Sequence, residues 1–167
     1  MEFLLKLEKK LEYYFIEKGP IKIPAKSKSQ LTIILPIIAI ISLLFYVISV
    51  LSGLVITFSS LSIVTFFRLL TLLICAMVIT FIIVSLIELF KLTKKSWNFL
   101  FYANLSALVY FILNFITNIV ASSRYFNGAM FTFITSTLIS FIFLIVTILI
   151  EIAILYFMFQ LKDQYKN

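Results

Sequence analysis

The chain has 167 residues, of which 63% are hydrophobic, and it carries a formal net charge of +7. A soluble domain of this length could not enclose so much apolar surface in one core, so the composition indicates an integral membrane protein. The chain has no histidine and a single cysteine, Cys75, which excludes an intramolecular disulfide and leaves no metal or cofactor site to predict.

Residues 1–18 are predicted to form an amphipathic helix. Its apolar face has the three- to four-residue spacing of a helix and consists of Leu4, Leu7, Leu11 and Phe15. Gly19 and Pro20 end the helix. We expect it to lie flat at the inner membrane interface, with docking onto a cytoplasmic or membrane partner as the alternative. Its charged residues interrupt the apolar stretch too often for a signal peptide.

Four long apolar runs follow a basic linker at residues 19–30, which we expect to be extended. The runs are residues 31–51, 64–90, 97–121 and 130–159, within a membrane domain of residues 31–161 that precedes a tail of residues 162–167. Each run can cross about 30 Å of hydrocarbon as a helix. Each also has a stripe of small or polar residues of the kind that joins helices in lipid. The predicted fold is therefore all-α, a closed membrane bundle of four helices, with a polar translocation path as the alternative role of the stripes.

The positive charges are sorted between the connecting segments. Residues 1–30, the loop between the second and third runs, and the tail are rich in lysine, whereas segments 52–63 and 122–129 are nearly neutral. Short lysine-rich loops stay in the cytoplasm, so both termini are predicted to be cytoplasmic. These charges should contact anionic lipid, which makes the bilayer the expected partner rather than nucleic acid. The predicted membrane-surface lysines are Lys6, Lys9, Lys10, Lys91, Lys94 and Lys95.

The inner end of the third run carries aromatic residues. Trp97 and Tyr102 are predicted to belong to an aromatic belt at the membrane interface. Just before them, Glu88 precedes Lys91 and Lys95 by one and two helical turns. This spacing predicts a local ion pair at the interface.

Glu151 is an ionisable residue inside the fourth run, about 12 Å below its inner end at 1.5 Å per residue. A carboxyl group at that depth is costly and marks a candidate site. It could be a proton or cation site that faces the bundle interior. Alternatively, it could be a structural hydrogen bond that ties the fourth run to Asn114 or Asn118 of the third. Arg68 is expected to reach the outer headgroups, at a different depth from Glu151.

Two short segments carry a resemblance. Residues 94–102 read KKSWNFLFY and residues 155–166 read LYFMFQLKDQYK. Together they resemble an uncharacterised family of small bacterial membrane proteins that have an amphipathic N-terminal helix, four spans and a Phe-Gln-x-Lys/Arg end. Ser96 departs from that pattern, in which glycine is common at this position. The resemblance implies an architecture and a bacterial inner membrane, and it carries over no activity.

These patterns favour a function without catalysis. The serines have no base beside them, so no catalytic residue is predicted and we expect the protein not to be an enzyme. The first hypothesis is an accessory or scaffold protein that acts through a membrane-protein partner or through self-association as a homo-oligomer. The alternative is a small oligomeric transporter or channel that uses Glu151.

Overall fold

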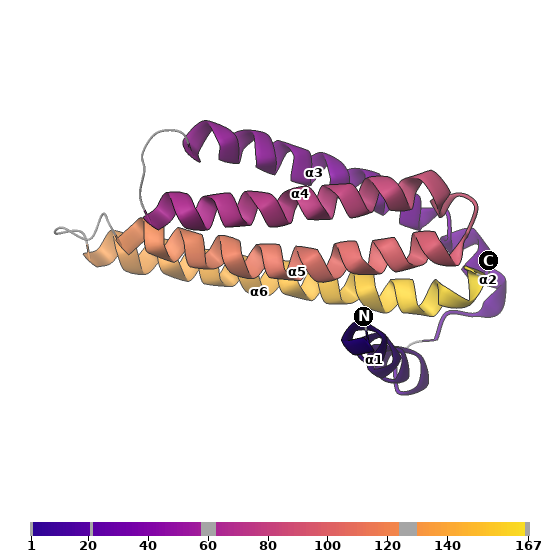
Figure 1. Ribbon diagram of the computed structural model, residues 1–167. Coiled ribbons are helices and arrows are strands. Elements are labelled where there is room, and N and C mark those ends of the chain that lie inside the picture. The colour runs from indigo at the N-terminus through magenta and orange to yellow at the C-terminus, as the bar shows by residue number, and fades with distance from the viewer. Residues whose placement is uncertain (1, 21, 58–62, 124–129, 166–167) are drawn as a thin grey trace.

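The computed structural model describes residues 2–20, 22–57, 63–123 and 130–165, and these ranges contain helices and no strand. Four helices are long and apolar enough to cross a membrane. They are α3 (Ile34–Thr57), α4 (Ile63–Leu89), α5 (Lys94–Ser123) and α6 (Met130–Leu161). They lie side by side in one bundle (Figure 1). The prediction of an all-α bundle with four potential membrane spans is confirmed. Most of the two nearly neutral connections, residues 58–62 and 124–129, lies outside the described residues.

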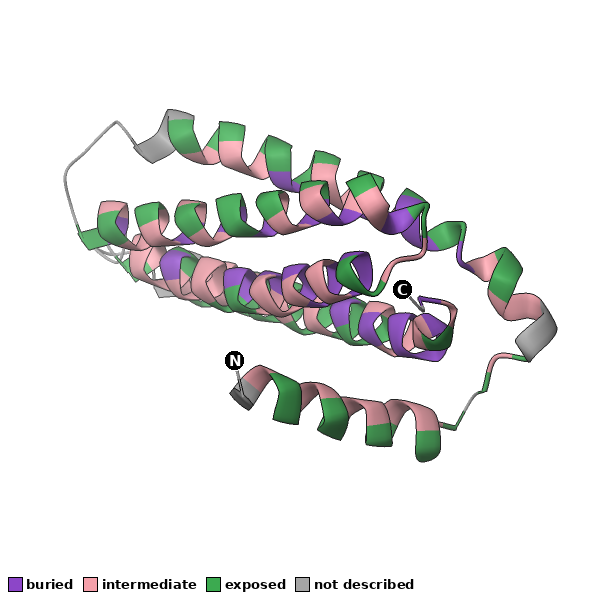
Figure 2. Cartoon of the chain, turned by 45° about the vertical axis from the view of Figure 1, so that its right-hand side comes forward, coloured by how far each residue is buried: buried purple, intermediate pink, exposed green. Residues whose placement is uncertain are grey.

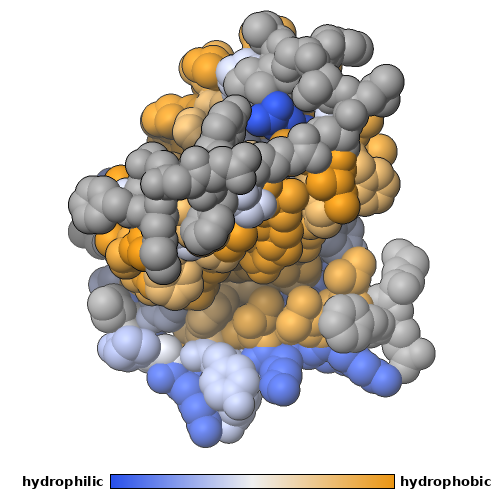
Figure 3. Space-filling model, turned by 90° about the vertical axis from the view of Figure 1, so that its left-hand side faces the viewer, coloured by the Kyte–Doolittle hydropathy of each residue, from blue (hydrophilic) through white to orange (hydrophobic). Residues whose placement is uncertain are grey.

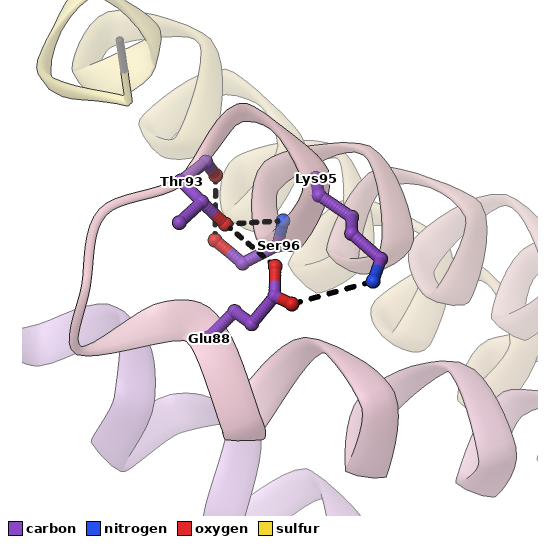
Figure 4. Close-up of polar contacts among 4 residues, drawn as sticks. All are labelled: Glu88, Thr93, Lys95 and Ser96. Atoms are coloured by element: carbon purple, nitrogen blue, oxygen red, sulfur yellow. Dashed lines mark hydrogen bonds and ion pairs between the residues drawn. The ribbon is translucent and has the colours of Figure 1, made fainter. Parts of the chain in front are cut away.

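Helices α5 and α6 are longer than the apolar runs, because they also include polar residues at their ends. Helix α5 begins at Lys94 rather than at the predicted residue 97. The Thr93 hydroxyl caps this helix by accepting a hydrogen bond from the Ser96 amide at 3.2 Å. Ser96 also donates its own hydroxyl to the Thr93 carbonyl at 2.7 Å, and Figure 4 shows both bonds. Trp97 therefore lies inside the first turn of α5 rather than at its first residue.

The turn between α4 and α5 is short and holds the predicted ion pair. Lys95 Nζ lies 3.3 Å from Glu88 Oε1, and the Thr93 hydroxyl donates to Glu88 Oε2 at 3.0 Å (Figure 4). The ion pair between Glu88 and Lys95 is therefore confirmed. Leu92 takes a left-handed conformation with φ of 52° and allows the chain to reverse. The half-buried Leu92 side chain packs against the core.

The linker was wrongly predicted to be extended throughout. Its second half forms the short helix α2 (Ala25–Leu31), which leads through a turn into α3. Pro24 lies at the N-cap, and its carbonyl accepts hydrogen bonds from the amides of Ser27 and Lys28. The segment has no apolar periodicity, so its helix depends on this proline start and on continuity with α3 rather than on an amphipathic face.

Helix α1 (Glu2–Glu12) continues through a π-helical turn at Tyr13–Glu17 and lies outside the bundle beside α6. Figure 1 views it nearly end-on while the bundle helices are seen from the side, so α1 runs across their direction. In Figure 3, hydrophilic atoms line the side of α1 that faces away from the bundle and apolar atoms lie above them. A helix lying flat on a membrane surface has this orientation and polarity.

Helix α5 is central to the core, with α4 and α6 packed on either side of it, and its buried residues run along most of its length (Figure 2). The exposed surface of α3, α4 and α6 is rich in Ile, Leu and Phe. Such a surface is expected where lipid tails replace water as the surrounding solvent. The largest fully buried side chains gather near the end where α4 and α6 finish, which we call the lysine-rich end. They are Trp97, Phe101, Phe159, Leu35, Leu89, Met158 and Leu161.

Candidate functional site

Glu151 lies inside the bundle, with only 8% of its surface exposed. The hydroxyl of Tyr46, on α3, donates a hydrogen bond to Glu151 Oε1 at 3.4 Å. Glu151 therefore links α6 to α3. The prediction that it ties α6 to Asn114 or Asn118 of α5 is wrong.

The register of the helices explains this partner. Glu151 lies ten residues before the end of α6, and Asn104 lies ten residues after the start of α5. Both helix ends are at the lysine-rich end, so Asn104 is level with Glu151. Asn114 is ten residues farther along α5, which is about 15 Å at 1.5 Å per residue. The amide nearest to Glu151 on α5 is thus Asn104, which sequence reasoning did not select.

A small cavity of about 20 Å³ adjoins Glu151 between all four long helices. One water molecule needs roughly 10–15 Å³ by the same measure, so the cavity has room for a single water or a small cation. Its polar lining comes from Ser42, Tyr46, Asn104 and Glu151. The Asn104 amide nitrogen donates to the Leu100 carbonyl at 2.8 Å, which leaves the side-chain oxygen for the cavity. The cavity thus offers oxygen atoms, the ligands that hard cations prefer.

Tyr46 is held in place by packing from several sides. Its exposed fraction is 3%, and its ring makes an edge contact with the ring of Tyr110 at a centroid distance of 5.5 Å. The Tyr46 carbonyl also accepts a hydrogen bond from Cys75 Sγ at 3.6 Å. On the first apolar run, Tyr46 shares a helical face with Ser42, Ser49 and Gly53, but the sequence does not connect it with Glu151. In the structure, Tyr46 lies 12 residues after the start of α3 and Glu151 lies 10 residues before the end of α6, so they are within one turn of the same depth. The predicted runs begin and end elsewhere and would place them about two turns apart.

Aromatic residues close the bundle between Glu151 and the lysine-rich end. The Trp97 ring stacks on Phe101 at a centroid distance of 5.4 Å and meets the edge of Phe159 at 5.2 Å. Its indole nitrogen donates to the Met158 carbonyl at 3.5 Å. We call Trp97, Phe101, Met158 and Phe159 the aromatic plug. Each of the four side chains is at most 1% exposed, so α5 and α6 are tightly packed between the Glu151 cavity and the surface at that end.

The assignment of Trp97 to an interfacial belt is wrong, because only 1% of its surface is exposed. Trp97 lies on the same face of α5 as the buried residues Phe101 and Asn104, and this face packs into the bundle, where Lys162 Nζ lies 5.0 Å from the Trp97 ring centroid. Tyr102 is half-buried, with its ring 6.2 Å from that of Phe81 on α4. Its place in an aromatic belt stays a prediction.

Asn114 and Asn118 line two larger chambers toward the opposite end of the bundle. The first, of about 240 Å³, lies between α3, α4 and α5 and also contains Arg68. The second, of about 230 Å³, lies between α5 and α6. Neither chamber includes Glu151 among its lining residues. The predicted group of Glu151, Asn114 and Asn118 therefore divides into two regions at different depths.

The lysine-rich end also holds α1 against α6. The Phe15 ring contacts Tyr156 and Phe159 at centroid distances of 5.6 Å, and the Gln160 amide donates to the Phe15 carbonyl at 2.7 Å. Lys162 Nζ lies 2.9 Å from Glu8 and 2.6 Å from Glu12. The end of α1 and the π-helical turn that follows it thus pack on the core of the chain, through Leu11, Phe15 and Ile16. The surface-predicted lysines of α1 and the α4–α5 turn are exposed: Lys6, Lys9, Lys10, Lys91, Lys94 and Lys95.

Within the described ranges, no group of three or more His, Cys, Asp or Glu side chains is arranged to hold a metal ion. Comparison with protein-family models, curated proteins and solved structures finds no match to the chain.

Proposed function

We propose that the protein is a small transporter or channel of the bacterial inner membrane, with both termini in the cytoplasm, and that Glu151 binds a proton or a small monovalent cation during transport. The lysines at the end of the bundle that carries α1 and the end of α6 support this orientation by the positive-inside rule. The resemblance of residues 94–102 and 155–166 to a bacterial family supports the membrane assignment.

The observation that carries the proposal is the environment of Glu151. Its carboxyl group is buried, makes no ion pair with the described part of the chain, and borders a cavity with room for one water or ion. A buried carboxyl group without a cationic partner is costly in a membrane and serves ion or proton pathways in many membrane proteins. The hydroxyls of Ser42 and Tyr46 add further oxygen ligands. One carboxylate with neutral oxygens suits a monovalent cation better than a divalent one, which needs more charge to replace its hydration shell.

Flux through proteoliposomes tests this function. The full chain is reconstituted, and proton entry is followed with an internal pH dye under an imposed potential, while sodium entry is followed with a radioactive tracer. Wild-type protein is expected to raise one of these fluxes above that of protein-free vesicles. Glu151→Gln keeps the shape and the acceptor for Tyr46 but removes the ionisable group, so flux should fall to the protein-free rate.

Glu88→Gln is the matched control, because Glu88 lies at the end of α4 and its ion pair is far from the cavity. It should keep wild-type flux. Wild-type flux no higher than that of empty vesicles for either ion would contradict the proposal, as would full flux in the Glu151→Gln variant.

An accessory or scaffold role is the second candidate, and the outer face of α1 favours it. Lys9, Lys10, Tyr13 and Tyr14 are exposed on this face, where a partner or a second copy could bind. Crosslinking and mass spectrometry in mild detergent test it, with Tyr13→Ser/Tyr14→Ser as the variant. This variant leaves the docked side of α1 unchanged. A crosslinked partner that disappears with the double substitution would support the role, and identical crosslinks in both proteins would exclude this face.

A further inference from the structure

The chamber that contains Arg68 has an unusual lining for the interior of a membrane bundle. Arg68 on α4 is joined by hydroxyl groups from α3, α4 and α5 and by two amides from α5. Its polar lining residues are Ser49, Ser52, Arg68, Thr71, Tyr110, Asn114, Thr117 and Asn118. Among the described residues, no carboxylate lines this chamber or its neighbour between α5 and α6. The fixed charge of the chamber is therefore positive.

The two amides need partners that the described chain does not supply. Neither the Asn114 nor the Asn118 side chain makes a hydrogen bond within the described residues, although both lie in a helix that can cross a membrane. Polar groups inside a bilayer are stable when something satisfies their hydrogen bonds. Each amide has two N–H donors, and both residues line the chamber that contains Arg68 as well as its neighbour.

Other polar groups fix the shape of the chamber. The hydroxyls of Thr71 and Thr117 lie 3.2 Å apart and join α4 to α5 at its wall. Both hydroxyls are also bonded to carbonyls of their own helices, at 2.8 and 2.7 Å. The wall is thus held by internal bonds. Arg68 also interacts within the chain, but its guanidinium has five N–H groups, and together with the amides of Asn114 and Asn118 it offers donors to a bound molecule.

We propose that this chamber binds an oxyanion, a phosphate group carried either by a free anion or by an anionic lipid headgroup. Arginine presents several N–H donors in a plane that matches phosphate oxygens, and amide N–H groups complete such a site. The chamber has a volume of about 240 Å³, enough for a phosphate with its hydration. The site is distinct from Glu151 and goes beyond the proposed cation transport, so either proposal can fail without the other.

The depth of Arg68 fits both sources of phosphate. Arg68 lies five residues after the start of α4, which is about 8 Å from that end of the helix. Lipid phosphates lie near that level, and the long arginine side chain can reach the interface. A free anion would enter from the same end.

Binding is tested on the full-length protein in a neutral detergent. Thermal unfolding is recorded in sodium phosphate and in sodium chloride at matched ionic strength, and native mass spectrometry counts retained phosphatidylglycerol against phosphatidylcholine. Preferential stabilisation by phosphate identifies the free anion, and preferential retention of phosphatidylglycerol identifies the headgroup. Either result, if lost in Arg68→Gln, supports the proposal. The affinity is expected to fall about tenfold or more, because the charge-assisted bonds are lost.

Lys94→Gln is the control, because it removes one exposed positive charge at the lysine-rich end of the bundle. It should keep the preference, whereas Arg68→Lys should keep part of it. Asn118→Leu is the second test variant. Its side chain is exposed to the chambers rather than packed, so the fold should tolerate the change even where Arg68→Gln does not fold. No preference for phosphate or phosphatidylglycerol in wild type, or an unchanged preference in both Arg68→Gln and Asn118→Leu, would overturn the proposal.

Discussion

Removing the charge of Lys162 should release α1 from the bundle. Its ammonium group lies 2.9 Å from Glu8 and 2.6 Å from Glu12, and it is the cation that joins the C-terminal end of α6 to α1. The substitution Lys162→Met keeps most of the aliphatic stem but leaves the two glutamates one helical turn apart without this partner. Like charges at that spacing repel, so the variant loses an attraction and gains a repulsion.

The size of the effect follows from the exposure of the three groups. The side chains of Lys162, Glu8 and Glu12 are 23%, 15% and 39% exposed, so solvent screens the pairs only in part. A charge-assisted bond under these conditions contributes about 0.5–1 kcal/mol, and two of them about 1–2 kcal/mol. A change of that size alters the ratio of docked to undocked α1 by a factor of about 5–30.

Trp97 provides the assay, because it is the only tryptophan of the chain and lies under Lys162. Its fluorescence and its quenching by acrylamide are measured in nanodiscs. Wild-type Trp97 should be well protected, since its exposed fraction is 1%. Lys162→Met should increase the quenching constant and shift the emission to longer wavelength as α1 leaves.

A second variant separates undocking from the direct loss of a charge above the ring. Glu8→Gln/Glu12→Gln breaks the same pairs but keeps Lys162, so it should also increase quenching. Adding Lys162→Met to it should change little, because the pairs are already broken. Lys95→Met, which breaks the Glu88 pair at the same end, should leave Trp97 protected. The reasoning is refuted when acrylamide quenches Trp97 no faster in Lys162→Met and in Glu8→Gln/Glu12→Gln than in wild type.

Three further experiments test the packing of the bundle. Phe101→Ala removes a ring with 0% exposure that stacks on Trp97, so it should lower the free energy of unfolding by about 3–5 kcal/mol, as measured by thermal unfolding. Phe66→Ala, at a position that is 64% exposed, should have a much smaller effect. Gly19→Val places a side chain against the Phe15 carbonyl and within 2.9 Å of the Tyr156 hydroxyl, so it should raise Trp97 quenching, and unchanged quenching would show that the chain yields there. Thr71→Val and Thr117→Val should show a coupling of about 0.6 kcal/mol in a double-mutant cycle, whereas additive effects would mean that their 3.2 Å contact contributes nothing.

The four long helices could be predicted because the signal is local. An apolar run of sufficient length identifies a potential span whatever its neighbours are, and the ion pair of Glu88 with Lys95 is separated by only seven residues. Helix α2 was missed because its residues, AKSKSQL, have no apolar face to detect. Thr93 could have signalled the early start of α5, since threonine is a favoured N-cap residue. That start would have moved Trp97 one turn into the helix.

The partners inside the bundle could not be read from composition or periodicity. Whether Asn104 or Asn114 is level with Glu151 depends on the register of α6 against α5, and the two amides are nearly three helical turns apart on α5. Tyr46 and Glu151 are separated by 105 positions in the sequence, so periodicity gives no signal of their hydrogen bond. The sequence indicated a costly carboxyl group at Glu151 and polar stripes on each span. The structure shows that Glu151 lies at one depth in the bundle, whereas Asn114 and Asn118 of the α5 stripe lie at another.

The docking of α1 is expected to control transport through the aromatic plug. Trp97, Phe101, Met158 and Phe159 are each at most 1% exposed, and they fill the space between α5 and α6 on the side of Glu151 that faces the lysine-rich end. Phe15 of the α1 segment contacts Phe159, and Lys162 covers Trp97, so both contacts hold the plug from outside. Lys162→Met should therefore increase ion flux into proteoliposomes, by at most the 5–30-fold calculated for undocking. The same substitution in a Glu151→Gln background should restore no flux, because the binding site rather than the plug is then limiting. An increase of similar size in both backgrounds would mean that undocking opens a leak that does not pass Glu151, and the link between α1 and the proposed transport route would be lost.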